Sequence, residues 1–252
     1  MNDTTAPMAG RTVLVTGASR GVGRSIARAA HRDGATVVVH FSSNESAAEQ
    51  VASELGERVL LVRADLATPG GADGLWVEAV RRAARIDVLV NNAGAWIASP
   101  VDDPPEGPDW SAGWRQNLSL NLEAPADLCR AAIRHFRLSG AGVIVNIVSR
   151  SAHRGDDADH LAYGAAKGGL LALTKGIARG FAAEGILAYA VAPGWVATDL
   201  AGDLDPRVRE ALPMRELTPP EDVAEMVVFL ASGRSRHTTG ATIDITGADY
   251  VR

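Results

Sequence analysis

The chain has 252 residues and a mass of 26.3 kDa, with 25 basic and 30 acidic side chains and a net charge of −5. This length favours one large domain, and the 46% of apolar residues can supply its core. No basic block or membrane-length apolar run is present, so binding to nucleic acid or to a membrane is not expected. The single cysteine, Cys129, excludes an intrachain disulfide, and a zinc site is not expected around it.

The N-terminal segment does not resemble a signal peptide. Its first ten residues hold Asp3 and Pro7 but no Lys, Arg or apolar run. We therefore expect a cytoplasmic protein with a flexible tail over residues 1–10 and one domain over residues 11–252.

Strand-like and helix-like segments alternate along the chain. Thr12–Thr16 is a continuous β-branched run, typical of a buried parallel strand, and Val22, Ile26 and Ala29 then recur at helical spacing until Gly34. Further strands are expected at residues 36–40, 59–63, 86–90, 142–148, 187–192 and 241–245. Helices are expected between most of them, at residues 45–55, 71–84, 110–138, 158–184 and 220–232.

This alternation predicts a seven-stranded parallel sheet with helices on both faces, because parallel strands need crossover connections. A glycine cluster after the first strand favours a doubly wound α/β domain of the Rossmann type over a closed eight-stranded barrel. Two proline-containing segments, residues 97–108 and 200–219, are expected to be loops. Both would leave strands at the ligand edge of the sheet, where they could shape a substrate pocket.

The glycine cluster, TGASRGVG from Thr16 to Gly23, lies between the first strand and the first helix. Gly17 permits a sharp turn, Gly21 lets a pyrophosphate approach the backbone, and Gly23 allows helix and strand to pack closely. The helix start then offers N–H groups and a partial positive charge to phosphate. An ordinary glycine-rich turn is the alternative, but the strand–helix context favours a dinucleotide site.

The end of the second strand indicates which dinucleotide binds. NAD-binding folds commonly place an acidic residue there, which binds the ribose 2′-hydroxyl and repels a 2′-phosphate. Here the chain carries Ser42, Ser43 and Asn44, with no carboxylate before Glu45. These side chains can donate hydrogen bonds to a phosphate, and Arg20 can add charge unless it points into solvent. We predict NADPH as the preferred cofactor, with NADH also possible.

A candidate catalytic group follows the expected strand 142–148. Tyr163 and Lys167 are four residues apart and so share a helix face. An ammonium near a phenol favours the phenolate, so Tyr163 could act as acid or base. Ser149 stands at a strand end, where its hydroxyl could hydrogen-bond a substrate carbonyl, with Ser151 as the alternative.

Together these motifs resemble the short-chain dehydrogenase/reductase family, in its compact branch. The resemblance extends from about Arg11 to Gly247 and is greatest for the 3-oxoacyl carrier-protein reductases. It rests on the glycine cluster, Asn91-Asn92-Ala93-Gly94, the strand-end serine, Tyr163-xxx-Lys167 and Pro193-Gly194-xxx-Thr198, all in the family's order.

The resemblance implies a catalytic tetrad of Asn121, Ser149, Tyr163 and Lys167. Tyr163 would give a proton to the carbonyl oxygen during reduction, and Ser149 would hold and polarise that oxygen. Lys167 would bind the nicotinamide ribose and lower the pKa of Tyr163. Asn121 would anchor a water of a proton relay, and Asn117 is its nearest competitor.

The same resemblance places Asp65 by the adenine, Asn91 and Gly94 along the adenosine side, and Thr198 near the carboxamide. The expected cofactor-binding residues are Gly17, Ser19, Arg20, Gly21, Val22, Gly23, Ser42, Ser43, Asn44, Asp65, Leu66, Asn91, Ala93, Gly94, Tyr163, Lys167, Pro193, Gly194, Val196 and Thr198.

The expected function is that of an NADPH-dependent ketoreductase, which transfers hydride between the nicotinamide and a carbonyl or secondary alcohol. Its substrate would be a small carbonyl compound, such as an acyl thioester or a polycyclic ketone. The residues expected to line or border the pocket, unless they are packing residues, are Trp96, His153, Arg154 and Trp195.

A catalytically silent dinucleotide-binding sensor or regulatory subunit is the alternative function. The presence of both Tyr163 and Lys167 argues against it. The resemblance also suggests a homotetramer that is built on the long helices at residues 110–138 and 158–184.

Overall fold

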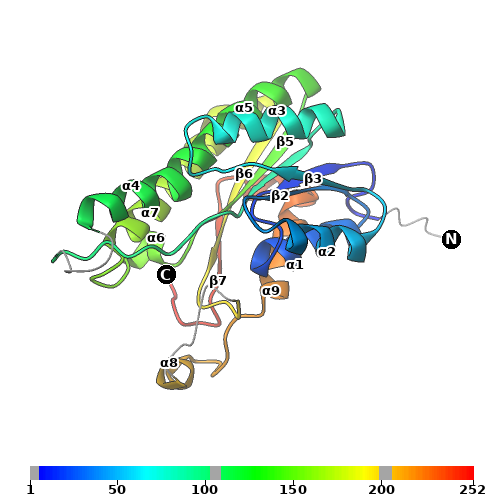
Figure 1. Cartoon of the computed structure of the whole chain (residues 1–252). Coiled ribbons are helices and arrows are strands. Elements are labelled where there is room, and N and C mark those ends of the chain that lie inside the picture. The colour runs from blue at the N-terminus through cyan, green and yellow to red at the C-terminus, as the bar shows by residue number, and fades with distance from the viewer. Residues whose placement is uncertain (1–5, 103–108, 199–205) are drawn as a thin grey trace.

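The computed structural model describes residues 6–102, 109–198 and 206–252, which contain a seven-stranded parallel sheet (Figure 1). The strands lie in the order β3-β2-β1-β4-β5-β6-β7, so the order reverses between β1 and β4. This is the doubly wound Rossmann-type sheet expected from the sequence. Its strands are β1 (Thr12–Val15), β2 (Thr36–Phe41), β3 (Val59–Arg63), β4 (Val88–Asn91), β5 (Gly142–Ile147), β6 (Ile186–Pro193) and β7 (Thr242–Ile245).

Helices cover both faces of the sheet, and each face buries a large apolar cluster. Helices α1, α2 and α9 pack on one face, and α3, α5 and α7 on the other. No helix in the described part of the chain is both long and apolar enough to cross a bilayer. The helices are α1 (Gly21–Arg32), α2 (Glu45–Leu55), α3 (Gly71–Ala83), α4 (Trp110–Leu118), η1 (Ser119–Glu123), α5 (Ala124–Ser139), α6 (Ser151–Arg154), α7 (Leu161–Phe181), η2 (Ala182–Glu184), α8 (Pro206–Ala211), α9 (Pro220–Ala231) and η4 (Arg236–Thr238).

Several element boundaries differ from the sequence-based expectation. The expected helix 110–138 is continuous, but it contains the π-helical turn η1 between α4 and α5. The expected helix 158–184 begins only at Leu161 and ends in the 3₁₀ turn η2. Helix α8 lies within the expected loop 200–219, and residues 103–108 and 199–205 of the two expected loops lie outside the described residues.

The N-terminal segment is folded over part of the expected tail. Met8 is fully buried, and its N–H donates to the carbonyl of Asp33 at 2.8 Å. The N–H of Arg11 in turn donates to the carbonyl of Met8 at 3.1 Å. The expected tail of residues 1–10 is therefore too long, because residues 6–10 pack on the domain; residues 1–5 lie outside the described residues.

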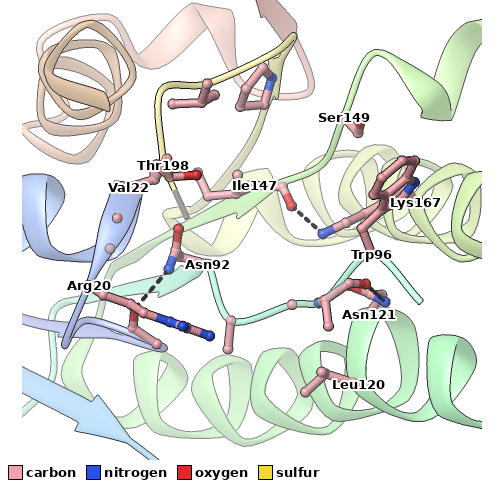
Figure 2. Close-up of a pocket in the computed structure, with 18 of the residues that line it drawn as sticks. Arg20, Val22, Asn92, Trp96, Leu120, Asn121, Ile147, Ser149, Lys167 and Thr198 are labelled. Atoms are coloured by element: carbon pink, nitrogen blue, oxygen red, sulfur yellow. Dashed lines mark hydrogen bonds between the residues drawn. The ribbon is translucent and has the colours of Figure 1, made fainter. Parts of the chain in front are cut away.

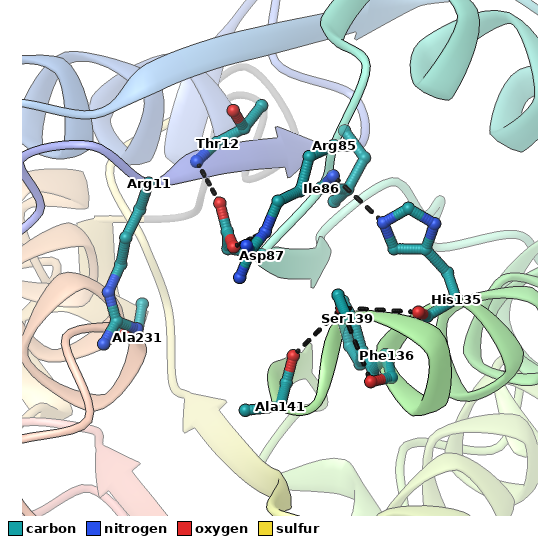
Figure 3. A network of polar contacts seen from close by, with 10 residues as sticks. All are labelled: Arg11, Thr12, Arg85, Ile86, Asp87, His135, Phe136, Ser139, Ala141 and Ala231. Carbon is teal, nitrogen blue, oxygen red and sulfur yellow. Dashed lines mark hydrogen bonds and ion pairs between the residues drawn. The ribbon is translucent and has the colours of Figure 1, made fainter.

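Polar contacts fix the amino ends of the two central strands, opposite the ligand edge (Figure 3). Asp87 accepts a hydrogen bond from the N–H of Thr12 at 2.8 Å and forms an ion pair with Arg85 at 2.6 Å. The N–H of Ile86 donates to Nε2 of His135 on α5 at 3.3 Å. Because Asp87 ties β1 to β4, it helps to set the register on which the opposite strand ends depend.

The start of β5 gives a test of the packing between sheet and helix. A Cβ at Gly142 would lie 2.1 Å from a ring atom of the fully buried Phe136. We expect Gly142→Ala to lower the free energy of unfolding by about 1–3 kcal/mol, because the ring cannot move without disturbing the core.

Gly74→Ala is the matched control, since Gly74 is exposed in α3 and a Cβ added there would have no neighbour within 4 Å. This change should raise stability by up to about 1 kcal/mol. Urea unfolding of both variants measures the effect, and equal stabilities would contradict the predicted clash.

Candidate active site

A cleft of about 690 Å³ opens at the carboxyl ends of the strands (Figure 2). It spans the point between β1 and β4 where the strand order reverses, which is where open α/β sheets bind ligands. The loops after six strands, β1 to β6, contribute to its lining.

The glycine cluster forms one end of this cleft. Gly17 and Gly21 have positive φ angles of 63° and 53°, which L-residues with side chains rarely adopt. A Cβ at Gly23 would lie 2.2 Å from the carbonyl oxygen of Gly17 and 2.5 Å from Nδ2 of Asn92. Helix α1 begins at Gly21, so its first N–H groups lie at the cleft. This arrangement fits a bound phosphate.

The structure brings nearly all of the expected site residues together in the cleft. Of the expected catalytic and cofactor-binding residues, only Asn91 does not line it. The residues that do are Gly17, Ser19, Arg20, Gly21, Val22, Gly23, Ser42, Ser43, Asn44, Asp65, Leu66, Ala93, Gly94, Asn121, Ser149, Tyr163, Lys167, Pro193, Gly194, Val196 and Thr198.

Asn91 lies beneath the cleft, and the expectation that it contacts the cofactor is therefore corrected. Its side chain is buried and donates to Oδ1 of Asn146 at 2.8 Å, and Asn146 donates to Thr174 at 2.8 Å. The next residue, Asn92, lines the cleft and donates to the carbonyl of Thr16 at 2.8 Å. Side chains alternate along a strand, so two successive asparagines cannot both face the ligand.

His40 is a residue of the cleft that the sequence analysis missed. Its Nδ1 accepts from the N–H of Gly17 at 3.0 Å, and its Nε2 lies 3.1 Å from the carbonyl of Ala64. These partners require a neutral ring with its proton on Nε2. Burial lowers the pKa of His40 to about 4. His40 thus links the glycine turn after β1 to the ends of β2 and β3. In the sequence, the one indication of this role was a histidine within an apolar strand.

Lys167 is buried in the cleft, although it carries an amine. Its Nζ donates to the carbonyl of Ile147 at 2.9 Å, as Figure 2 shows. Burial lowers the pKa of Lys167 to about 8. The same Nζ lies 5.7 Å from the centre of the Tyr163 ring.

The pKa of Tyr163 does not follow the sequence-based expectation. Burial raises it to about 12, a nearby Asp156 adds to the increase, and a hydrogen bond with Ser149 opposes it. The expected net lowering of this pKa is therefore not found in this structure, because burial, the largest cause, disfavours the phenolate. A phenol with this pKa is protonated at neutral pH, as a proton donor must be.

The two candidate serines have different partners. Ser151 donates from Oγ to Oδ2 of Asp156 at 2.6 Å, whereas hydrogen bonding by Ser149 lowers the pKa of Tyr163. The two serine hydroxyls are 3.2 Å apart. Because the proton of Ser151 is committed to a carboxylate, Ser149 is the better candidate for holding a substrate carbonyl.

Asn117 and Asn121 are also distinguished by their contacts. Asn117 is buried and donates to the carbonyl of Ile97 at 2.9 Å, away from the cleft. Asn121 lies on η1 and lines the cleft, where its amide exchanges two hydrogen bonds with the backbone of Ala95, at 3.2 and 2.9 Å. A Cβ at Gly94 would lie 2.6 Å from Oδ1 of Asn121. The extra residue of a π turn places Asn121 at this position.

Two tryptophans form the wall of the cleft beyond the catalytic side chains. The rings of Trp96 and Trp195 meet edge to face with centres 5.9 Å apart. His160 stacks on Trp96 at 3.6 Å, and the guanidinium of Arg150 lies 5.1 Å from the ring of Trp195. The expectation that both tryptophans border the pocket agrees with this placement.

His153 and Arg154 lie outside the cleft, in contrast to the expectation. His153 stacks on Tyr250 at 5.9 Å, next to the C-terminus. Arg154 lines a second, smaller hollow of about 330 Å³ that shares Arg150 and Trp195 with the cleft. The short helix α6, absent from the sequence-based prediction, turns both side chains away.

Comparison with known proteins identifies the family. A family model described as enoyl-(acyl carrier protein) reductase matches residues 17–247. The chain belongs to the short-chain dehydrogenase/reductase family. The expected family and the expected oxidoreductase class are thereby confirmed.

Similar members of the family have several substrates in their names. The chain is 34% identical to 3beta-hydroxysteroid dehydrogenase 1 of Eggerthella lenta, covering 94% of this chain and 93% of the relative. It is 32% identical to the 3-oxoacyl-(acyl-carrier-protein) reductase FabG of Staphylococcus epidermidis, covering 96% and 99%. A crystal structure of a short chain dehydrogenase from Burkholderia cenocepacia, in complex with NADP, superposes with a TM-score of 0.87 at 30% identity, covering 96% and 98%.

The buried His40 ring predicts a pH dependence of stability. Its pKa in the folded protein is about 4, below the ordinary 6.5, so the unfolded chain binds the extra proton between these values. Stability should therefore fall by up to about 3 kcal/mol as pH decreases through this window.

His40→Asn should remove this part of the acid slope, because the Asn oxygen can replace Nδ1 as the acceptor for Gly17 without titrating. Urea unfolding at several pH values measures the slope, and His237→Asn, at an exposed position, is the control. An unchanged slope in the His40 variant would contradict the assignment.

Proposed function

We propose that this protein is an NADPH-dependent ketoreductase in which Tyr163 is the general acid and base. The proposal rests on one observation: Ser149, Tyr163 and Lys167 line the same cleft, and the glycine cluster forms one end of it. Ser149 and Tyr163 both line this cleft, so both hydroxyls could reach one carbonyl oxygen.

The cleft residues fit a nicotinamide dinucleotide. The lack of a Cβ at Gly23 lets the start of α1 pack closely on Gly17 and Asn92, and this helix start would offer its N–H groups to a pyrophosphate. Asp65 and Leu66 line the cleft and would lie beside the adenosine. The glycine turn would hold the phosphates, and Lys167 and the Pro193-Gly194 turn would hold the nicotinamide end. The neighbour solved with NADP supports this choice of cofactor class.

The chain's own side chains would bind and protonate the substrate. Ser149 would donate a hydrogen bond to the carbonyl oxygen, and Tyr163 would transfer its phenolic proton to the same oxygen as negative charge develops there. When bound, the reduced nicotinamide supplies the hydride. Lys167, fixed by Ile147, would return a proton toward the phenol, and its pKa of about 8 makes this transfer accessible near neutral pH.

The substrate is proposed to be a small carbonyl compound with an apolar or planar body. The edge-to-face rings of Trp96 and Trp195 line the cleft and suit such a body. The names of the relatives, a steroid dehydrogenase and 3-oxoacyl reductases, are consistent with polycyclic ketones and acyl thioesters.

Tyr163→Phe tests the function. We expect kcat to fall by a factor of about 100 to 10,000, because the proton donor is lost, while NADPH binding is retained. Turnover is measured on a panel of ketones and 3-oxoacyl thioesters, and binding by NADPH fluorescence. Tyr250→Phe removes a tyrosine hydroxyl outside the cleft and should leave kcat unchanged.

A catalytically silent sensor is the competing function. It would bind NADPH and turn over nothing in the panel, and Tyr163→Phe would then have no measurable consequence.

The preference for NADPH rests on the polar groups at the end of β2. Ser42, Ser43 and Arg20 line the cleft there, and Asn44 already uses its Oδ1 to cap α2. Arg63, at the end of β3, donates to the carbonyl of Ser42 at 3.0 Å and adds a second guanidinium beside this turn. Two cations at this position favour a ribose 2′-phosphate.

Arg20→Ala should therefore lower kcat/KM for NADPH by about 10- to 100-fold and change that for NADH little. Arg24→Ala is the matched control, because Arg24 lies one turn further along α1 and pairs with Glu54 at 2.9 Å. Steady-state kinetics with both cofactors decide the matter, and a wild-type preference for NADH would refute the proposal.

A homotetramer built on α4, α5 and α7 is proposed from the family resemblance. We also propose that the protein acts in the cytoplasm. Sedimentation at micromolar concentration should give four times the chain mass of 26.3 kDa, and a monomer would rule the tetramer out.

A further inference from the structure

The second, smaller hollow adjoins the catalytic cleft and is rich in arginine. Its volume is about 330 Å³, and it shares Arg150 and Trp195 with the cleft. Arg150 directly follows Ser149 in the chain, so the hollow and the cleft meet beside the serine proposed to hold the carbonyl oxygen. A group bound in the hollow can therefore belong to a molecule whose carbonyl lies at Ser149.

Two of the arginines come from one turn of the chain at α6. Arg150 is the residue before this helix and Arg154 is its last residue, and the N–H of Arg154 donates to the carbonyl of Arg150 at 3.2 Å. Residues four apart in a helical turn lie on the same face, and both side chains line the hollow. The N–H of Arg150 also donates to the carbonyl of Pro193 at 3.1 Å, which fixes this turn to the end of β6.

The rest of the lining comes mainly from α8 and from the segment that follows β6. The carbonyl of Trp195 accepts from the N–H of Thr218 at 2.8 Å, so the chain beyond α8 is tied to the end of β6. The hollow thus combines charged groups with an apolar surface, as small-molecule sites do. Helix α8 and the residue after it contribute one guanidinium and three apolar side chains: Arg207, Val208, Ala211 and Leu212.

The described residues that line the hollow carry more positive than negative charge. Three of them have a guanidinium, and one, Asp249, has a carboxylate, which forms an ion pair with Arg150. Arg150 and Arg154 are close enough to repel each other. Burial and then the charge of Arg154 lower the pKa of Arg150 to about 10, and Asp156 opposes this decrease. A bound anion would offset the repulsion between the guanidinium groups.

We propose that this hollow binds an anionic group, a carboxylate or a phosphate, that the carbonyl substrate carries. The proposal deepens the ketoreductase function and rests on it, because the anion is placed on the molecule that is reduced. Guanidinium groups present paired N–H donors that match the oxygens of either anion. The rings of Trp96 and Trp195 would contact the part of the substrate that lies in the cleft.

Binding to the hollow can be measured without turnover. In the presence of NADP⁺ there is no hydride to transfer, so the keto acid levulinate can bind without being reduced. Inorganic phosphate is the second charged probe, and methyl levulinate is the neutral control. The Tm is measured against the concentration of each probe at constant ionic strength, because a ligand of the folded state raises stability according to its Kd. Phosphate also stabilises proteins by exclusion from their surface, so only the part of its effect that a hollow variant removes is counted.

Arg154→Ala and Arg207→Ala should each raise the Kd of a charged probe about tenfold, because a hydrogen bond between charged groups is lost. Arg154→Lys should restore part of the affinity, since it returns the charge without the paired donors. Both arginines are exposed, so the variants should fold. Arg209→Ala is the matched control, because Arg209 is exposed on α8 but does not line the hollow.

Each outcome of the titrations has a definite meaning. A loss of affinity for levulinate alone assigns a carboxylate to the hollow, and a loss for phosphate alone assigns a phosphate. Equal Kd values in wild type and in both hollow variants would overturn the proposal. An equal loss in Arg209→Ala would show a diffuse effect of surface charge, and a change in sedimentation with unchanged binding would show a subunit contact. Either result would also overturn it.

Turnover separates this proposal from the function on which it rests. In Arg154→Ala the KM for reduction of levulinate by NADPH should rise about tenfold, while kcat and the KM for methyl levulinate change little. If neutral ketones are reduced but the hollow binds neither charged probe, the ketoreductase function stands and the anion site fails. If no ketone is reduced, the ketoreductase function fails, and the phosphate titration still decides whether the hollow binds anions.

Discussion

The parallel pairing of β1 with β4 is the constraint on which the site depends. Val13–Val15 pair with Val88–Val90, and the N–H of Thr16 continues the ladder to the carbonyl of Val90 at 3.0 Å. Just beyond, Oγ1 of Thr16 accepts from the N–H groups of Asn92 and Ala93, both at 2.9 Å. The glycine turn and the loop after β4 are therefore fixed against each other before any ligand binds.

Burial of charge and hydroxyl groups determines the chemistry at the other end of the cleft. Lys167 and Tyr163 lie on one face of α7 and are packed against the end of β5, where hydration is lost. The same burial disfavours both the ammonium and the phenolate. It therefore lowers the pKa of Lys167 toward neutral pH and raises the pKa of Tyr163 away from it. The site at rest is therefore that of a proton donor.

Residues that are placed by contacts between sequence neighbours could be predicted, whereas residues that are placed by contacts between distant parts of the chain could not. Gly17, Gly21 and Gly23 could be assigned because a strand, a turn and a helix start are local and each glycine has a steric reason there. To tell Asn91 from Asn92, one must know the residue at which the strand ends. To assign His40, one must know which strands lie beside it. Asp156 carried no motif at all, since only the turn through α6 brings it to Ser151.

The sequence by itself determined the alternation of strands and helices, the glycine turn and the spacing of Tyr163 from Lys167, because hydrophobic periodicity and short-range sterics are written in neighbouring residues. Only the tertiary structure decided the depth of burial of these groups, and therefore the direction in which the pKa of Tyr163 moves. It also decided which asparagine faces the cleft, and that Ser151 is the serine whose hydroxyl is bound to a carboxylate. Electrostatic effects of this kind depend on what surrounds a group in space, and residues distant along the chain supply those surroundings.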